Sequence, residues 1–194
     1  MQIKKLLLLC LSIACFALAC LPASSTEPTA AAKKKRFFDL PAFFAQEAQR
    51  LGAKRVEKRS RAASEKGSAI SDTTQHQIES PEQWERELAL FARVQLNKSS
   101  FSDQYDIDSL RNDSAGTLTL RYRARKEHLY TQLVEIRLLN EQVQHISLLN
   151  RQSSLLTESR QQLQYTPDKG YSLQQTQRLP FAEPHTVELY AIFY

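Results

Sequence analysis

The sequence predicts an α+β domain in which two amphipathic helices pack on an antiparallel meander sheet of about six strands. Three observations lead to this fold class. Apolar residues recur at helical spacing in two segments of the first half of the chain. After Gly116 the hydrophobic period changes to two residues, which is typical of strands with one buried face. Short connections between these later segments favour antiparallel neighbours.

The first helix is predicted over Phe37 to Leu51. Asp39 suits the N-cap, proline is tolerated in the first turn, and Gly52 provides the stop. The segment holds four phenylalanines, which we interpret as core residues rather than as a platform for a ligand: Phe37, Phe38, Phe43 and Phe44.

The second helix is predicted from Ser80 to Asn97. Ser80 and Gln83 match a capping box, and Pro81 takes the first helical position. Trp84 begins the apolar stripe, which continues through Leu88 and Phe91. Between the two helices, residues 53–79 are polar and mixed. They fit either a solvent-facing hairpin or a mobile loop, and the sequence leaves both open.

The six predicted strands occupy residues 116–125, 130–139, 143–150, 155–165, 171–179 and 187–193. The helices would cover one face of the sheet, and the other face would be wet and rich in Arg, Gln and Thr. A basic row on one strand is interpreted as part of this solvated face, with an anionic partner as the alternative: Arg121, Arg123, Arg125 and Lys126.

Composition excludes several classes of protein. The chain has 194 residues, enough for one domain with appendages, and 42% of them are hydrophobic, which excludes the disordered class. Only 4 residues are glycine, and no phosphate-binding, nucleophile-elbow or zinc-protease motif is present. The acidic cluster Asp103, Asp106, Asp108 and Asp113 has no calcium-loop pattern, so we interpret it as loop turns. We therefore predict no catalytic residue, no metal site and no cofactor, and the chain is not expected to be an enzyme.

The N-terminus has the layout of a secretory signal. Lys4 and Lys5 precede an unbroken run of apolar or small residues from Leu6 to Ala19, which is shorter than the roughly 20 residues a membrane-spanning helix needs. The run closes with Phe16-Ala17-Leu18-Ala19-Cys20.

This ending resembles the lipobox of bacterial lipoproteins. The resemblance implies cleavage after Ala19 and acylation of Cys20 by diacylglycerol and a fatty acid such as palmitate. Ala17 departs from the family, which usually has Leu there, and Leu11 to Cys15 is a weaker second match. Family members retained at the inner membrane often have Asp after the cysteine, whereas residue 21 is Leu, so the resemblance implies an outer-membrane anchor.

Two other outcomes stay open for this segment. Ala17 and Ala19 also form an ordinary secretory cleavage site, which would release a soluble periplasmic or secreted protein, and an uncleaved anchor is the third outcome. After Cys20 the chain has no cysteine, so the exported domain would have neither a disulfide nor a thiol nucleophile.

The predicted organisation has three parts. Residues 1–19 are a lipoprotein signal peptide, residues 20–36 are the lipidated cysteine with a flexible basic tether, and residues 37–194 are a single α+β domain. The tether ends in four basic residues that are candidates for contact with an anionic membrane surface, although a solvated linker is the alternative: Lys33, Lys34, Lys35 and Arg36. Because the chain is predicted to be exported, we expect no nucleic-acid partner despite an isoelectric point near 9.2.

Three functions remain. The first is a non-catalytic envelope lipoprotein, attached to the membrane by its N-terminal lipid, that binds an envelope protein or assists assembly. The second is a carrier of a lipid or other hydrophobic ligand, because a curved sheet closed by aromatic helices can enclose an apolar cavity. An enzyme of unfamiliar design is the third. The sequence does not determine the oligomeric state.

Overall fold

The computed structural model describes residues 37–64, 67, 69–94, 96–98 and 103–194. They belong to one compact unit, Arg36–Tyr194. None of the helices among these residues has the length and apolarity to cross a membrane.

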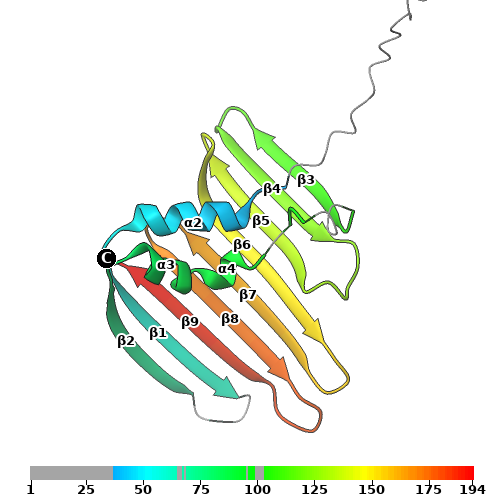
Figure 1. The fold of residues 1–194 in the computed structure, drawn as a ribbon. Coiled ribbons are helices and arrows are strands. Elements are labelled where there is room, and N and C mark those ends of the chain that lie inside the picture. Colours follow the sequence, from blue (N-terminus) through cyan, green and yellow to red (C-terminus); the bar gives the residue numbers. More distant parts are fainter. Residues whose placement is uncertain (1–36, 65–66, 68, 95, 99–102) are drawn as a thin grey trace, which may run out of the picture. The chain divides into compact units, whose positions relative to one another are not determined.

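The described residues form a nine-stranded antiparallel sheet with three helices across one of its faces (Figure 1). The helices are α2 (Leu40–Leu51), α3 (Pro81–Glu87) and α4 (Ala89–Ala92). The strands are β1 (Lys54–Ser64), β2 (Ile70–Ile78), β3 (Tyr105–Asn112), β4 (Thr117–Ala124), β5 (Thr131–Leu139), β6 (Gln142–Ser153), β7 (Glu158–Thr166), β8 (Gly170–Arg178) and β9 (His185–Phe193).

The strand order is β2-β1-β9-β8-β7-β6-β5-β4-β3. Strands β3 to β9 form the predicted meander, and the hairpin β1–β2 joins it through β9, where Val56 lies opposite Phe193. Gly170 at the start of β8 allows a close approach of two strands. A Cβ atom there would lie 1.9 Å from the carbonyl oxygen of Ala191, and its φ of 138° is one that L side chains rarely adopt.

The α+β class is confirmed, but the predicted number of about six strands is too low. The hairpin alternative holds for residues 53–79. This hairpin is not purely solvent-facing, because β1 pairs with β9 and buries Val56. Strand β3, which we interpreted as an acidic loop, is an edge strand. Its residues after Ile107 are exposed, so its sequence lacks the alternation that marks a half-buried strand.

The helices are shorter than predicted. Helix α2 begins at Leu40, where Asp39 caps it by accepting a hydrogen bond from the backbone N–H of Ala42 at 3.0 Å. The second predicted helix is two short helices. The capping box of Ser80 and Gln83 is present, but the chain bends at Leu88, where φ is −93° and ψ is 4°. Beyond the bend the buried residues have spacings that no single helical face provides: Phe91, Val94 and Leu96.

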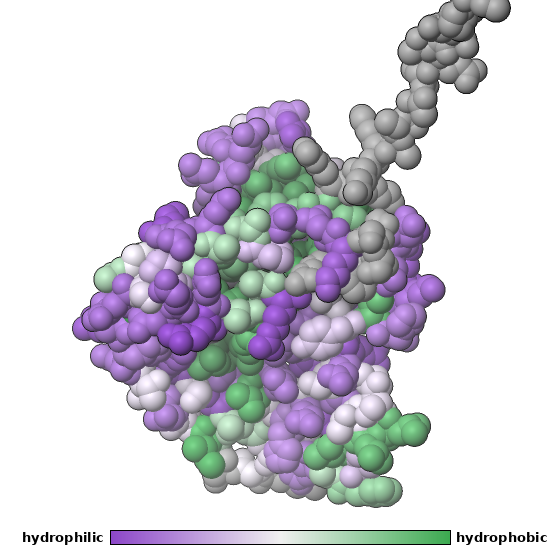
Figure 2. All heavy atoms as spheres, in the orientation of Figure 1, coloured by the Kyte–Doolittle hydropathy of each residue, from purple (hydrophilic) through white to green (hydrophobic). Residues whose placement is uncertain are grey.

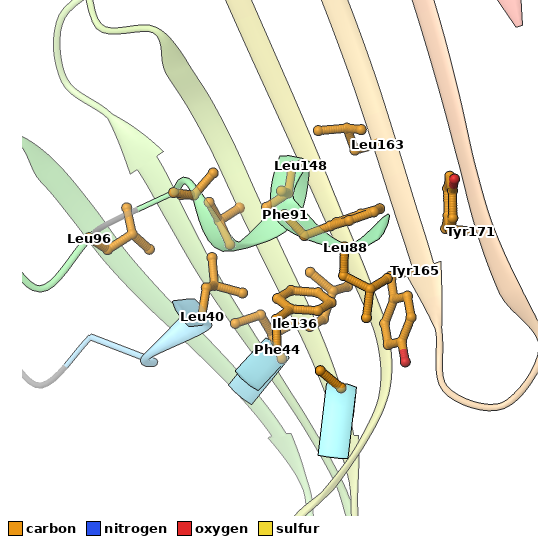
Figure 3. Close-up of a cluster of buried hydrophobic side chains, with 14 of the residues drawn as sticks. Leu40, Phe44, Leu88, Phe91, Leu96, Ile136, Leu148, Leu163, Tyr165 and Tyr171 are labelled. Carbon is orange, nitrogen blue, oxygen red and sulfur yellow. The ribbon is translucent and has the colours of Figure 1, made fainter. Parts of the chain in front are cut away.

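The core lies between the helices and the sheet. Phe44 of α2 and Phe91 of α4 have ring centroids 5.1 Å apart, and both pack against Tyr165 of β7 (Figure 3). The opposite face is polar as predicted. Arg121 of β4 donates to Glu135 of β5 there, with Nη2 and Oε2 2.9 Å apart. The buried apolar side chains of the domain thus gather on the side that the helices cover.

Candidate functional site

The residues singled out from the N-terminal sequence lie outside the described residues. They are Ala19, Cys20, Lys33, Lys34, Lys35 and Arg36. The basic row begins on β4 and continues past its end at Ala124. It is partly neutralised, because Arg121 pairs with Glu135 and Arg125 pairs with Asp106 of β3 at 2.8 Å. Among the described residues, no group of three or more His, Cys, Asp or Glu side chains is placed to hold a metal ion.

A large hollow with both aromatic and charged walls lies along one side of α2, and we call it the α2 groove. Its volume is about 810 Å³, within the range of small-molecule sites. One wall is α2 and the residues before it. The other wall is made by the β5–β6 turn and the β7–β8 turn, which contribute residues 141–144 and 166–169.

The apolar part of the α2 groove is formed by Phe38, Phe43 and Val143. Phe43 connects it to the core, since its ring lies 5.1 Å from that of Phe44 and 6.4 Å from that of Tyr165. Two of the four phenylalanines that we interpreted as core, Phe38 and Phe43, are thus only partly buried and line the groove. Phe37 and Phe44 are buried as predicted.

The charged part of the groove is an ordered network at the C-terminal half of α2. Arg50 donates to both oxygens of Asp168 at 2.9 and 3.0 Å, and Lys54 donates to the same carboxylate at 3.2 Å. The hydrogen bond from Arg50 is the main reason why the pKa of Asp168 lies below its usual value. Lys169 also lines the groove. An amphiphile could therefore place its polar group here and its apolar part against Phe43.

A buried carboxylate anchors α2 beside the groove. Glu47 accepts two hydrogen bonds from Arg50, at 2.7 and 2.9 Å, and one from the Tyr165 hydroxyl at 2.5 Å. Burial, followed by this hydrogen bond, raises the pKa of Tyr165. We call this the Glu47–Tyr165 contact.

A second contact of the same kind anchors α3. The Tyr171 hydroxyl donates to Glu87 at 2.6 Å, and Lys58 of β1 donates to the same carboxylate at 2.8 Å. Tyr165 and Tyr171 are direct cross-strand partners on β7 and β8, and their hydroxyl groups point in opposite directions (Figure 3). Adjacent tyrosines therefore hold two different helices, and we call the second one the Glu87–Tyr171 contact.

Sequence reasoning missed both the groove and the two contacts. Glu47 and Glu87 each lie on a helix whose buried side is otherwise apolar, but nothing near them in the sequence identifies their tyrosine partners. A charged residue at a core position of a helical pattern is the one signal that points to such a pair.

The comparisons with known proteins add a distant likeness of fold. No protein-family model matches this chain, and no curated protein matches it. Among solved structures it is similar to the crystal structure of a LolA superfamily protein from Nitrosomonas europaea. The identity is 10%, the TM-score is 0.27, and the alignment covers 78% of this chain and 91% of that chain. A likeness of this size says nothing about a ligand, so any function has to come from the residues themselves.

Proposed function

We propose that the domain is a carrier that holds a lipid or another hydrophobic ligand in the α2 groove. The observation behind this proposal is the composition of the groove. A single hollow of about 810 Å³ joins the partly exposed rings of Phe38 and Phe43 to the charged group of Arg50, Asp168 and Lys169.

This arrangement suits an amphiphile. Asp39 and Glu141 also line the groove, so an anionic head has to lie at Lys169. Ligand sites combine mostly apolar walls with a few polar groups that fix orientation. Lys169 has no carboxylate partner among the described residues and is free to meet a phosphate or carboxylate, whereas Arg50 and Lys54 already share Asp168. The apolar chain would lie along Phe43 and Val143.

The carrier is the alternative that the sequence raised, and the groove favours it over a purely structural or assembly role. Binding an envelope protein, attachment through Cys20 and an outer-membrane address stay predictions from the N-terminal sequence. If they hold, the carrier would work tethered to a membrane, where hydrophobic ligands are found.

The groove can be tested by filling it. Ala42 and Ala45 are both exposed on α2, but only Ala42 lines the groove. We expect Ala42→Trp in the full chain to weaken binding of a lysophosphatidylglycerol with a palmitoyl chain by about tenfold or more, which corresponds to about 1.4 kcal/mol. Ala45→Trp is the matched control and should bind like the parent chain. The measurement is a titration followed by isothermal calorimetry below the critical micelle concentration.

Native mass spectrometry of the gently purified full chain gives an independent result. A carrier should show added mass beyond the covalent mass of the chain, and this added mass should be lost in Ala42→Trp. The proposal is wrong if the chain carries no added mass and also fails to bind the lysophospholipid, or if both tryptophan variants behave alike.

A further inference from the structure

Large apolar side chains are exposed on two loops at one end of the sheet. The β6–β7 loop and the β8–β9 loop lie at the same end, because antiparallel strands alternate their connections. Leu155 and Phe181 are fully exposed, while Leu156 is 70% exposed and Leu179 is 39% exposed. We call these four the tip residues. Figure 2 shows hydrophobic atoms at the lower edge of the view, where these loops lie in Figure 1.

The β6–β7 turn directs two leucines into solvent. Ser154 and Thr157 close the turn: the backbone N–H of Ser154 donates to the carbonyl of Thr157 at 2.8 Å, and the backbone N–H of Thr157 donates to Ser154 Oγ at 3.1 Å. Leu155 and Leu156 are the two residues between them. Turn positions of this kind usually hold Gly, Asn, Asp or Pro, and nothing in the turn itself requires leucine.

In the β8–β9 loop an exposed aromatic residue, Phe181, has an unfavourable backbone conformation. The N–H of Ala182 donates to the carbonyl of Leu179 at 3.3 Å, with Pro180 and Phe181 between them. Phe181 has a φ of 63°, the position where a type II turn favours glycine. A bulky residue with positive φ is a strained outlier, and such strain is found mostly at functional sites.

Arginines surround the base of these loops on the polar face of the sheet. Arg151 of β6 lies directly opposite Arg160 of β7, and Arg178 of β8 precedes Leu179. Arg160 and Arg178 have no carboxylate partner among the described residues, while Arg151 pairs with Glu158 at 3.0 Å. Arg151 and Arg160 line a hollow of about 370 Å³. Glu158 lines the same hollow and neutralises Arg151, so an outside anion would meet Arg160 and Arg178.

We propose that the tip residues insert into the surface of an anionic phospholipid bilayer, with Arg151, Arg160 and Arg178 contacting lipid phosphates. Apolar side chains on a projecting edge with cations behind them match the two layers of such a surface, the acyl boundary and the charged headgroups. This charge pattern favours a bilayer over a protein partner as the occupant. The α2 groove is formed by turns at the opposite end of the sheet, so this proposal does not depend on the carrier function.

The test measures whether each loop enters the membrane. Leu155→Cys, Phe181→Cys and Ser114→Cys are made one at a time in the full chain, labelled with an NBD fluorophore, and reconstituted in phosphatidylethanolamine–phosphatidylglycerol vesicles. Ser114 is exposed in the β3–β4 turn at the other end of the sheet. The parent chain labelled in the same way gives the background from Cys10, Cys15 and Cys20.

We expect blue-shifted NBD emission and quenching by lipids brominated on their acyl chains at positions 155 and 181, and neither at position 114. An Arg151→Gln, Arg160→Gln double variant should lose part of the quenching at position 155, as should vesicles of phosphatidylcholine. Equal signals at all three positions would overturn the proposal. So would a blue shift at 155 or 181 that brominated lipid does not quench, because that result indicates burial against a protein surface.

Discussion

The Glu47–Tyr165 contact and the Glu87–Tyr171 contact each join a glutamate to a tyrosine hydroxyl and hold two different helices, but their surroundings differ. Glu47 is neutralised by Arg50 of its own helix, and Arg50 has a second partner in Asp168. Glu87 is neutralised by Lys58, which belongs to β1 and has no other carboxylate partner among the described residues. The α3 contact therefore joins a helix, the β1–β2 hairpin and the meander, whereas the α2 contact joins a helix to the rim of the groove.

This difference indicates which of the two helices is held more firmly against the sheet. Trp84 strengthens the α3 side, because its indole N–H donates to the carbonyl of Gly52 at 2.7 Å and its ring lies 4.9 Å from that of Phe193. On the other side, Phe38 and Phe43 leave part of their surface in the groove. We therefore expect α2 to be displaced more easily than α3 when a ligand is taken up.

The largest difference between the two contacts in the free energy of unfolding should come from replacing each glutamate by glutamine. A glutamine can still accept the tyrosine hydrogen bond, so Glu87→Gln mainly leaves Lys58 without its carboxylate, and we expect a loss of about 2 kcal/mol in the free energy of unfolding. Glu47→Gln leaves Arg50 with Asp168, and about 1 kcal/mol should be lost. Urea denaturation with unchanged m-values checks this order. Equal losses would show that the two contacts are equivalent.

Removing each tyrosine hydroxyl should have a smaller effect on stability than Glu87→Gln, and it should show which of the two helices borders the ligand. Tyr165→Phe and Tyr171→Phe should each lower the free energy of unfolding by about 1 kcal/mol. Because Glu47 lines the groove and Glu87 does not, only Tyr165→Phe should change the affinity for palmitoyl lysophosphatidylglycerol. A change in affinity in Tyr171→Phe of the same size would contradict the assignment of the groove to α2.

The smallest effect concerns acid stability on the α2 side. The pKa of Asp168 is lowered in the folded chain, mainly by its hydrogen bond with Arg50, so its contribution is present above the usual pKa of a free aspartate and disappears as the pH falls through the lowered value. The side chain is 56% exposed, which screens the pair and limits the contribution to about 1 kcal/mol or less.

Asp168→Asn should therefore be slightly less stable than the parent chain at neutral pH, and the gap should close below about pH 4. Thermal unfolding at several pH values measures this gap. A gap that stays constant over the acid range would mean that the charge of Asp168 does not contribute.

Local patterns predicted the parts of the fold that depend on local chemistry. The capping box at Ser80, the N-cap at Asp39 and the two-residue period after Gly116 each involve residues close in sequence, and each was found in the structure. The α2 groove could not be predicted in this way, because Phe43 and Val143 meet only through the sheet order. Strand β3 was not predicted for a similar reason: Asp106 resembles a loop residue until its partner Arg125, directly after β4, is placed beside it.

Strand β9 has a consequence for how the sheet is assembled. It lies between β8 and β1, so within the described sheet it is the strand that pairs with both the hairpin formed early in the chain and the meander formed later. Until residues 185–193 have emerged during synthesis, β1 and β8 both present unpaired edges, and contacts across such a large sequence separation form slowly. The sheet therefore remains open, and its edges available to a chaperone, until residues 185–193 have been synthesised.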